Sequence, residues 1–407
     1  MVPLKQLFAF LPPQRLEKLA CSYQLDAAHS VKLSGPALFL CLLTGLLHHP
    51  ELSQRLLEET YHQQTGKDFD HSSFGKCLKR MDPDYFADIF TELRRKVQPL
   101  MTPRTQQALK LRIVDATSVT LSAKLLAWGL SSRNCNPDKA RRTIKSVVEL
   151  SEGLPNLLKV CDDKTENADS VALGATMQMH SQPGDLWVFD KGCHGRDRLL
   201  GIHQEQAFWL TPHTQQKTRT LQTLFCLPEG ERPVGPPFEA SERFVVVRVE
   251  QAVFENSQES AKSRAQWSEM PVLLVYGLRF DVRTKTWKEL VLMTNLPLAQ
   301  EGAHAGPYTW AELAAVYGGR WDIEVFFKFI KQHLNYSHLT SRSENGIKVM
   351  IYMSLIVAVL LIWYKEQTGI DRGWRSVKFW LEVDVREWTQ QVLQGVRLAP
   401  DGGLVMS

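Results

Sequence analysis

The stretch Tyr317-Gly-Gly-Arg320-Trp-Asp-Ile-Glu324-Val-Phe-Phe-Lys328-Phe-Ile-Lys331 is the most informative part of this 407-residue sequence. Its apolar residues recur at helical spacing, which predicts a helix with one face buried against a sheet. At about 100° per residue, four polar side chains fall within an arc of about 60°, namely Tyr317, Arg320, Glu324 and Lys331. A carboxylate between two cations and a phenol suits a metal ion beside a phosphate. The charges alone also fit an ordinary solvated face, with Glu324 pairing Lys328 at i,i+4.

Length and composition predict a soluble protein of two or three domains. The apolar share of 44% and the charged share of 23% are ordinary for globular proteins. A net charge of +4 is compatible with DNA binding without being evidence for it. The seven cysteines form no CxxC pair, which predicts reduced thiols in a cytosolic protein rather than a zinc site or a disulfide framework.

A membrane location is not expected. The amino terminus lacks the basic start and apolar core of a signal peptide. The apolar segment Val349 to Tyr364 is shorter than the roughly 20 residues of a membrane span, and charged residues flank it. We therefore interpret it as a buried helix and place the protein in the cytoplasm.

The first hundred residues have the pattern of helices. Pro36 to Leu47 is apolar, Leu52 to Gln64 is amphipathic and ends at Gly66, and Ser72 or Ser73 is a candidate cap for a helix through Arg80. The last two helices resemble a helix-turn-helix, in which basic residues would meet phosphates: Lys76, Lys79 and Arg80. Plain packing of two helices explains the same pattern.

The character changes after this region to a mixed α/β pattern. Strands are predicted at Arg112 to Leu121, Lys124 to Leu130, Thr143 to Leu150, Leu186 to Asp190 and Phe208 to His213, and helices at Ala168 to Met179 and Asp197 to Glu205. A β-rich block then interrupts the alternation, with strands at Phe244 to Gln251, Val272 to Phe280 and Trp287 to Thr294. The α/β pattern resumes with the helix that contains Glu324.

Two aspartates follow apolar runs, Asp115 after Leu111-Arg-Ile-Val and Asp190 after Trp187-Val-Phe. Side chains just beyond buried strands lie at the sheet edge where α/β proteins place their sites. Together with Glu324 they would supply the sparse set of carboxylate oxygens that Mg²⁺ prefers. Each aspartate alone also fits a turn or a helix cap, and spacing does not select these two over other aspartates, such as Asp163 or Asp197.

The spacing Tyr317-x2-Arg320-x3-Glu324-x6-Lys331 resembles the Tyr-Arg-Glu-Lys signature of the DDE transposases of bacterial insertion sequences. Asp115-Ala-Thr-Ser and Asp190-Lys-Gly are similar to the first and second acidic motifs of that family, and Leu292-Met-Thr-Asn-Leu296 resembles the strand that leads towards the glutamate helix. The chain departs from many relatives at Cys193 and His194, where they have an aromatic residue.

The resemblance implies an α/β fold with a ribonuclease-H-like core, interrupted by a β-rich insertion and preceded by a small all-helical domain. The expected regions are a helical DNA-binding domain (1–105), the first part of the core (106–214), the insertion (215–306), the second part of the core (307–370) and a helical tail available for dimerisation (371–407). Asp115, Asp190 and Glu324 would hold two Mg²⁺ ions, which Mn²⁺ could replace.

The resemblance also implies a cut-and-paste reaction on DNA. Tyr317, Arg320 and Lys331 would bind phosphates near the transposon end, a homodimer would hold the ends, and the freed 3′-hydroxyl would attack the opposite strand or the target DNA. Two other functions stay open from the residues: a metal-dependent nuclease of the same fold that cuts structured DNA, and an inactive regulator that only binds DNA. Some relatives stack an aromatic residue of this insertion on a flipped base. Trp267 and Trp287 lie in the insertion here, but a place in the core of the block explains them at least as well, so neither is assigned to DNA.

Overall fold

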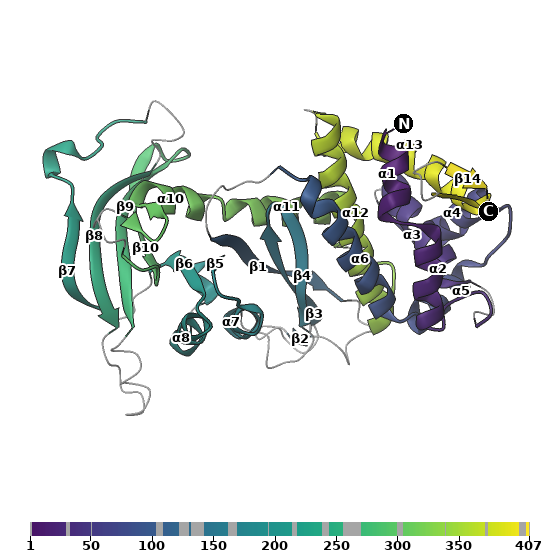
Figure 1. Cartoon of the computed structure of the whole chain (residues 1–407), viewed down its shortest axis with the longest axis horizontal. Coiled ribbons are helices and arrows are strands. Elements are labelled where there is room, and N and C mark those ends of the chain that lie inside the picture. Colours follow the sequence, from purple (N-terminus) through teal and green to yellow (C-terminus); the bar gives the residue numbers. More distant parts are fainter. Residues whose placement is uncertain are drawn as a thin grey trace.

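The computed structural model describes residues 2–29, 33–49, 51–102, 109–121, 130–131, 142–161, 169–193, 195–213, 218–237, 244–254, 270–298, 304–337, 339–370, 373–398 and 404–406. The molecule is elongated, with a helical region at one end and a β-rich region at the other (Figure 1). A large sheet flanked by helices connects them, so the mixed α/β class predicted from the sequence is confirmed. The predicted strand Lys124 to Leu130 and the residues His194 and Trp267 lie wholly or almost wholly outside the described residues.

The amino-terminal region is helical, as predicted. Its helices are α1 (Val2–Phe10), α2 (Pro13–Ser22), α3 (Gly35–His48), α4 (Gln54–Thr65), α5 (His71–Arg80) and α6 (Pro83–Val97), followed by the 3-10 turn η1 (Gln98–Leu100). Gly66 ends α4 in the left-handed conformation with φ 66°. The predicted serine cap of α5 is wrong, because the Asp70 side chain accepts the hydrogen bond of the Ser72 amide at 2.8 Å, so the cap lies two residues before Ser72 and the helix begins at His71.

One large sheet passes through the centre and the β-rich end of the molecule. Its strands are β1 (Lys110–Thr120), β2 (Leu130–Ser131), β3 (Arg142–Ser151), β4 (Leu154–Cys161), β5 (Asp185–Val188), β6 (Phe208–Pro212), β7 (Thr218–Cys226), β8 (Phe244–Phe254), β9 (Pro271–Asp281) and β10 (Thr286–Thr294). The order is β2-β3-β1-β5-β6-β10-β9-β8-β7, and β4 pairs with β3. Strands β1, β5 and β6 are parallel to one another, whereas every other pair in the sheet is antiparallel.

The β-rich block does not form a separate sheet. Its last strand, β10, pairs antiparallel with β6, so that β7 to β10 extend the central sheet sideways. The sequence pattern located β8, β9 and β10 but missed β4 and β7. Strand β7 is exposed along almost its whole length and therefore lacks the alternation that marks a half-buried strand.

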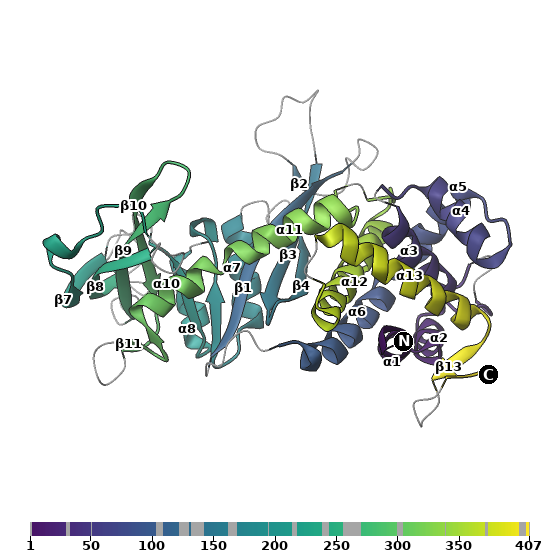
Figure 2. The ribbon, with the colours of Figure 1, turned by 90° about the horizontal axis from the view of Figure 1, so that it is seen from above.

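Helices cover both faces of the sheet (Figure 1). Helices α7 (Asp169–His180) and α8 (Arg196–Gln204) pack on one face, and α10 (Trp310–Gly318) and α11 (Trp321–His333) pack on the other. Seen from above, α10 and α11 run almost end to end along the sheet towards the helical region (Figure 2). Short elements complete the fold: the 3-10 turns η5 (Lys191–Cys193) and η6 (Glu229–Glu231), and the two-stranded pairs β11 (His304–Ala305) with β12 (Tyr308–Thr309) and β13 (Val396–Leu398) with β14 (Leu404–Met406).

The apolar helix predicted near Tyr364 is α12 (Glu344–Thr368), and it lies in the core. It is the one helix among the described residues with the length and hydropathy of a membrane span, but 83% of that window is buried inside the protein. It packs against α6, α5, α3, β4 and α13 (Trp374–Leu393), so the helical region and the central sheet share one continuous hydrophobic core.

Candidate active site

The parallel pairing of β1 and β5 brings two aspartates to the same level of the sheet. Ile113 and Val188 are the last residues of the two strands that pair, and Asp115 and Asp190 each follow two residues later in the chain. Neighbouring strands are about 5 Å apart. Strand β5 ends at Val188, so Asp190 lies two residues beyond it rather than at the end of the predicted strand Leu186 to Asp190, whereas Asp115 lies inside β1, within the predicted strand Arg112 to Leu121. Strand β1 continues to Thr120 in antiparallel pairing with β3, and Asp115 lies where β1 leaves β5.

Both aspartates belong to the face of the sheet that α10 and α11 cover. Side chains alternate between faces along a strand. Ile113 and Val188 pack in the core that also contains Ile323 of α11, and each aspartate is two residues beyond one of them. Both carboxylate residues are half-buried, which leaves part of their surface open to solvent or ligand.

The predicted continuous helix from Tyr317 to Lys331 is interrupted at the Gly-Gly pair. Helix α10 ends at Gly318, and α11 begins at Trp321. Across the break the Arg320 amide bonds the Tyr317 carbonyl at 3.0 Å, an i→i−3 hydrogen bond that tightens the turn. Glycine has a low helix propensity, so a break at this pair is expected from residue type. The break turns Tyr317 and Arg320 towards the end of β5.

Arg320 and Glu324 form an ion pair across one turn, with Arg320 Nη1 at 2.7 Å from Glu324 Oε1. Arg320 is 8% exposed, and its Nε has no hydrogen-bond partner among the described atoms. Burial opposes the charge of Arg320, but the hydrogen bond to Glu324 and the nearby Tyr317 and Asp190 outweigh burial and raise the pKa of the guanidinium. Its guanidinium carbon lies 5.7 Å from the centroid of the Tyr317 ring.

Lys331 and Tyr317 connect the helices to the two aspartates. Burial lowers the pKa of the Lys331 ammonium, and Asp115 counteracts part of that shift. Burial raises the pKa of the Tyr317 phenol, Asp190 raises it further, and Arg320 opposes both. Electrostatically, therefore, Lys331 is a neighbour of Asp115, whereas Tyr317 and Arg320 are neighbours of Asp190. The structure brings all six predicted site residues to one face of the sheet.

The donor set suits a hard divalent cation in its chemistry. Carboxylate oxygens are the ligands such ions take, and Asp115 and Asp190 each lie two residues beyond the last paired residues of β1 and β5. Within the described ranges, however, no group of three or more His, Cys, Asp or Glu side chains is gathered closely enough to hold one ion. Glu324 is bonded to Arg320 through Oε1, so its carboxylate would reach a metal ion shared with the aspartates either through Oε2 or after leaving that ion pair.

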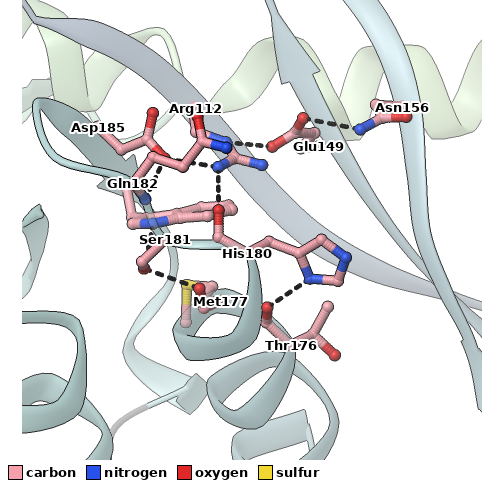
Figure 3. A network of polar contacts seen from close by, with 10 residues as sticks. Arg112, Glu149, Asn156, Thr176, Met177, His180, Ser181, Gln182 and Asp185 are labelled. Atoms are coloured by element: carbon pink, nitrogen blue, oxygen red, sulfur yellow. Dashed lines mark hydrogen bonds and ion pairs between the residues drawn. The ribbon is translucent and has the colours of Figure 1, made fainter. Parts of the chain in front are cut away.

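A buried ion network fixes the register of the strands that carry the aspartates (Figure 3). Arg112 of β1 bonds Glu149 of β3 at 2.5 Å and Asp185 of β5 at 2.6 Å. It also donates to the His180 carbonyl at 2.6 Å, and its guanidinium lies 3.8 Å from the centroid of the Trp187 ring. These partners come from β3, β5 and the end of α7, so a slip of β1 against β5 would break the contacts of Arg112 with Asp185 and Trp187.

For two residues of the β-rich block, Trp287 and Arg279, the structure shows surroundings that the sequence did not reveal. Trp287 packs on Phe280 with ring centroids 5.3 Å apart and donates to the Gly235 carbonyl at 2.9 Å, which favours a packing role. Arg279 of β9, which the sequence did not single out, acts electrostatically on Tyr317. The one sequence signal that could have shown that the Arg279 side chain faces α10 is its alternation with the buried residues of β9.

The family model and the curated relatives that match this chain are both described as transposases. The profile of the family described as "Transposase DDE domain" matches residues 106–360. A "Putative transposase" from Sinorhizobium fredii is 25% identical over 279 residues, which are 68% of this chain and 66% of that protein. A "Putative transposase for insertion sequence element IS4SA" from Synechocystis sp. is 23% identical over 296 residues, 73% of this chain and 72% of that protein. The chain thus spans about two thirds of the length of these curated relatives.

Among solved structures, the piggyBac transposase in a synaptic complex with hairpin DNA aligns with 98% of this chain and 81% of its own. The TM-score is 0.45 and the sequence identity 11%.

Proposed function

This chain belongs to the transposase DDE-domain family, and from that premise we propose how it acts as a DNA transposase: it cuts the ends of an insertion sequence and joins them to target DNA by metal-dependent phosphoryl transfer. The observation that carries the proposal is the convergence of Asp115, Asp190 and the Arg320–Glu324 pair on one face of the sheet.

The core is proposed to be ribonuclease-H-like. In support, β4, β3 and β1 are antiparallel neighbours, and β5 and β6 then follow in parallel, in the order β4-β3-β1-β5-β6. We retain the division into a helical DNA-binding domain (1–105), a core in two parts (106–214 and 307–370), a β-rich insertion (215–306) and a tail (371–407). Because α12 packs on both the helical region and β4, these regions would move together rather than as independent bodies.

Asp115, Asp190 and Glu324 are the proposed ligands of two Mg²⁺ ions. Two such ions, when bound, activate the attacking water or 3′-hydroxyl and stabilise the leaving oxygen. The carboxylates supply negative charge on one side of the scissile phosphate. Arg320, once released from Glu324, is placed to bind a phosphate oxygen through its planar fork, and Lys331 contributes a point charge near Asp115. The buried Tyr317 hydroxyl positions the arginine beside Asp190.

The transposase would work as a homodimer that holds two transposon ends and the target DNA. Trp374 and Trp388 of the tail are packed: Trp374 lies 4.3 Å from the Phe329 ring, and Trp388 is fully buried. Trp380 is 50% exposed beside Phe379 and Val383 on α13, and this apolar face is the proposed contact with a second copy.

The proposal is tested with a duplex that carries the inverted repeat flanking the protein's own gene. With Mg²⁺, the wild type should give nicked, hairpin or strand-transfer products, and Glu324→Gln should bind the same duplex without cutting it. Asp322→Asn is the matched control, because it removes one carboxylate from the exposed side of the same helix. Cutting by Glu324→Gln at the wild-type rate would exclude the glutamate from the reaction.

The two other functions predict different products. A nuclease would give nicks and breaks without joined products. A DNA-binding regulator would bind the end and leave it intact with Mg²⁺ and with Mn²⁺ alike.

A further inference from the structure

Three side chains of the β-rich block form a row on the same side of the sheet as the active-site helices. Phe244 of β8 lies opposite Arg279 of β9, and Arg279 lies opposite Lys288 of β10. Directly opposed residues in an antiparallel pair project from the same face. Val275, which shares that face of β9, packs in the core that contains Tyr317 of α10. The row therefore extends the face of the sheet that carries the active site onto β8, β9 and β10.

The aromatic member of the row leaves the arginine uncovered. A Cβ atom at Gly277 would lie 2.1 Å from Phe244 Cζ, so the phenyl ring lies over Gly277 and depends on the absence of a side chain there. Arg279 remains exposed. The row thus presents the cation of Arg279 to solvent.

The two cations of the row differ in their partners. Lys288 is paired with Asp281 on the same hairpin. In the described part of the chain, no hydrogen bond or ion pair joins Arg279 to another residue, and its charge acts on Tyr317 across the gap between β9 and α10. An exposed guanidinium that bonds no described residue, next to the proposed phosphate-binding site, has the geometry to donate hydrogen bonds to two oxygens of a further phosphate.

We propose that Arg279 binds a backbone phosphate of the transposon end, so that the DNA strand held by Arg320 and Lys331 continues over β9 and β10. This inference rests on the proposed transposase function and assigns the β-rich block a part in holding the substrate. Arg279 contacts DNA without taking part in the bond-making steps.

The test compares Arg279→Gln with Arg219→Gln, which removes the same charge from the exposed edge strand β7. Arg219 lies opposite Val253, which lies opposite Pro271, and Pro271 is roughly 26 Å along β9 from Arg279. Binding of the full-length proteins to the end duplex is measured in EDTA over a series of salt concentrations. Arg279→Gln should weaken binding about three- to tenfold and make the slope of log K against log salt less steep by about one. Arg219→Gln should keep the wild-type slope.

Two further measurements separate a phosphate contact from a structural role. Arg279→Lys should recover the slope, because an ammonium still neutralises one phosphate. Ethylation of single phosphates should identify one position that impairs wild-type binding but not binding by Arg279→Gln. A slope for Arg279→Gln equal to that of the wild type, or no lost ethylation position, overturns the proposal. Failure of the wild type to cut the duplex would instead refute the proposed function, and the binding series would still report on Arg279.

Discussion

The two ends of strands β1 and β5 carry the same kinds of side chain in opposite settings. At the amino end, Arg112 is saturated by Glu149, Asp185 and a backbone carbonyl, with every charged side chain at most 6% exposed. At the carboxyl end, Arg320 has a single carboxylate partner, Glu324, whose side chain is 34% exposed. A network in which the charges are paired and buried fixes strand register. An ion pair that stays partly exposed can still bind a ligand.

The difference follows from solvation. Taking charges out of water is costly unless each is paired and hydrogen-bonded, so a fully buried network has to be complete. Half-buried carboxylates keep some hydration and can exchange one partner for another at lower cost. The paired charges at the amino ends of β1 and β5 therefore hold the two strands in register. Asp115 and Asp190, further along the strands, are the carboxylates that can bind a ligand.

The largest expected effect comes from opening the closed network. Arg112→Met leaves Glu149 and Asp185 buried without their cation, and it should lower the free energy of unfolding by about 3–5 kcal/mol, measured by urea denaturation. The variant Arg112→Met, Glu149→Leu, Asp185→Leu should recover most of that loss, because no charge remains unpaired. An unchanged unfolding free energy in the single variant would contradict the assigned role of the network.

A matched pair on one strand sharpens the comparison. Asp185→Asn should cost about 2 kcal/mol of stability, because it removes a charged hydrogen-bond partner of buried Arg112. Asp190→Asn should leave stability within about 0.5 kcal/mol of the wild type, as for substitutions away from packed features. Equal losses of stability in the two variants, measured by thermal denaturation, would mean that both ends of β5 are structural.

The open end should bind divalent metal, and the closed end should not. Mn²⁺ at about ten times its dissociation constant should stabilise the wild type by about 1.4 kcal/mol, seen as a rise in Tm of a few degrees. Asp190→Asn should lose this rise and Asp185→Asn should retain it. A rise of equal size in Asp190→Asn would place the metal elsewhere.

The open ion pair between Arg320 and Glu324 should contribute little to stability. Arg320→Gln should cost less than about 1 kcal/mol of unfolding free energy, because Glu324 keeps its contact with water. Binding of the transposon end should nevertheless weaken about tenfold, since one phosphate contact corresponds to about 1.4 kcal/mol here. A gel-shift titration with Arg219→Gln on β7 as the charge-matched control distinguishes this loss from a general effect of charge.

Much of the fold could be predicted from the sequence where local pattern and tertiary setting agree. The apolar runs of β5 and β6 and the helical spacing of α11 and α12 mark buried elements directly. Strand β7 could not be found because its exposed residues carry no alternation. The joining of β10 to β6 depends on pairing between residues far apart in the chain, which no local pattern encodes.

The candidate site was predicted residue by residue, but its arrangement was not. Helical spacing correctly set Arg320 and Glu324 on one face, as their ion pair shows. It gave no sign that the Gly318–Gly319 pair would break the helix, or that Glu324 would pair with Arg320 rather than Lys328. Arg112 and Arg279 were not singled out, because a buried network and a row across three strands exist only in the folded sheet.

The central claim is that the point where β1 leaves β5 and the carboxyl end of β5 form the reactive centre, whereas the amino ends of the two strands only support it. It is tested most directly by single-turnover cleavage of the end duplex with Mg²⁺. The account predicts that Asp190→Asn loses cleavage by about 10³-fold or more, equivalent to roughly 4 kcal/mol, while folded Asp185→Asn cleaves within about threefold of the wild-type rate. Cleavage by Asp190→Asn at the rate of Asp185→Asn would contradict it.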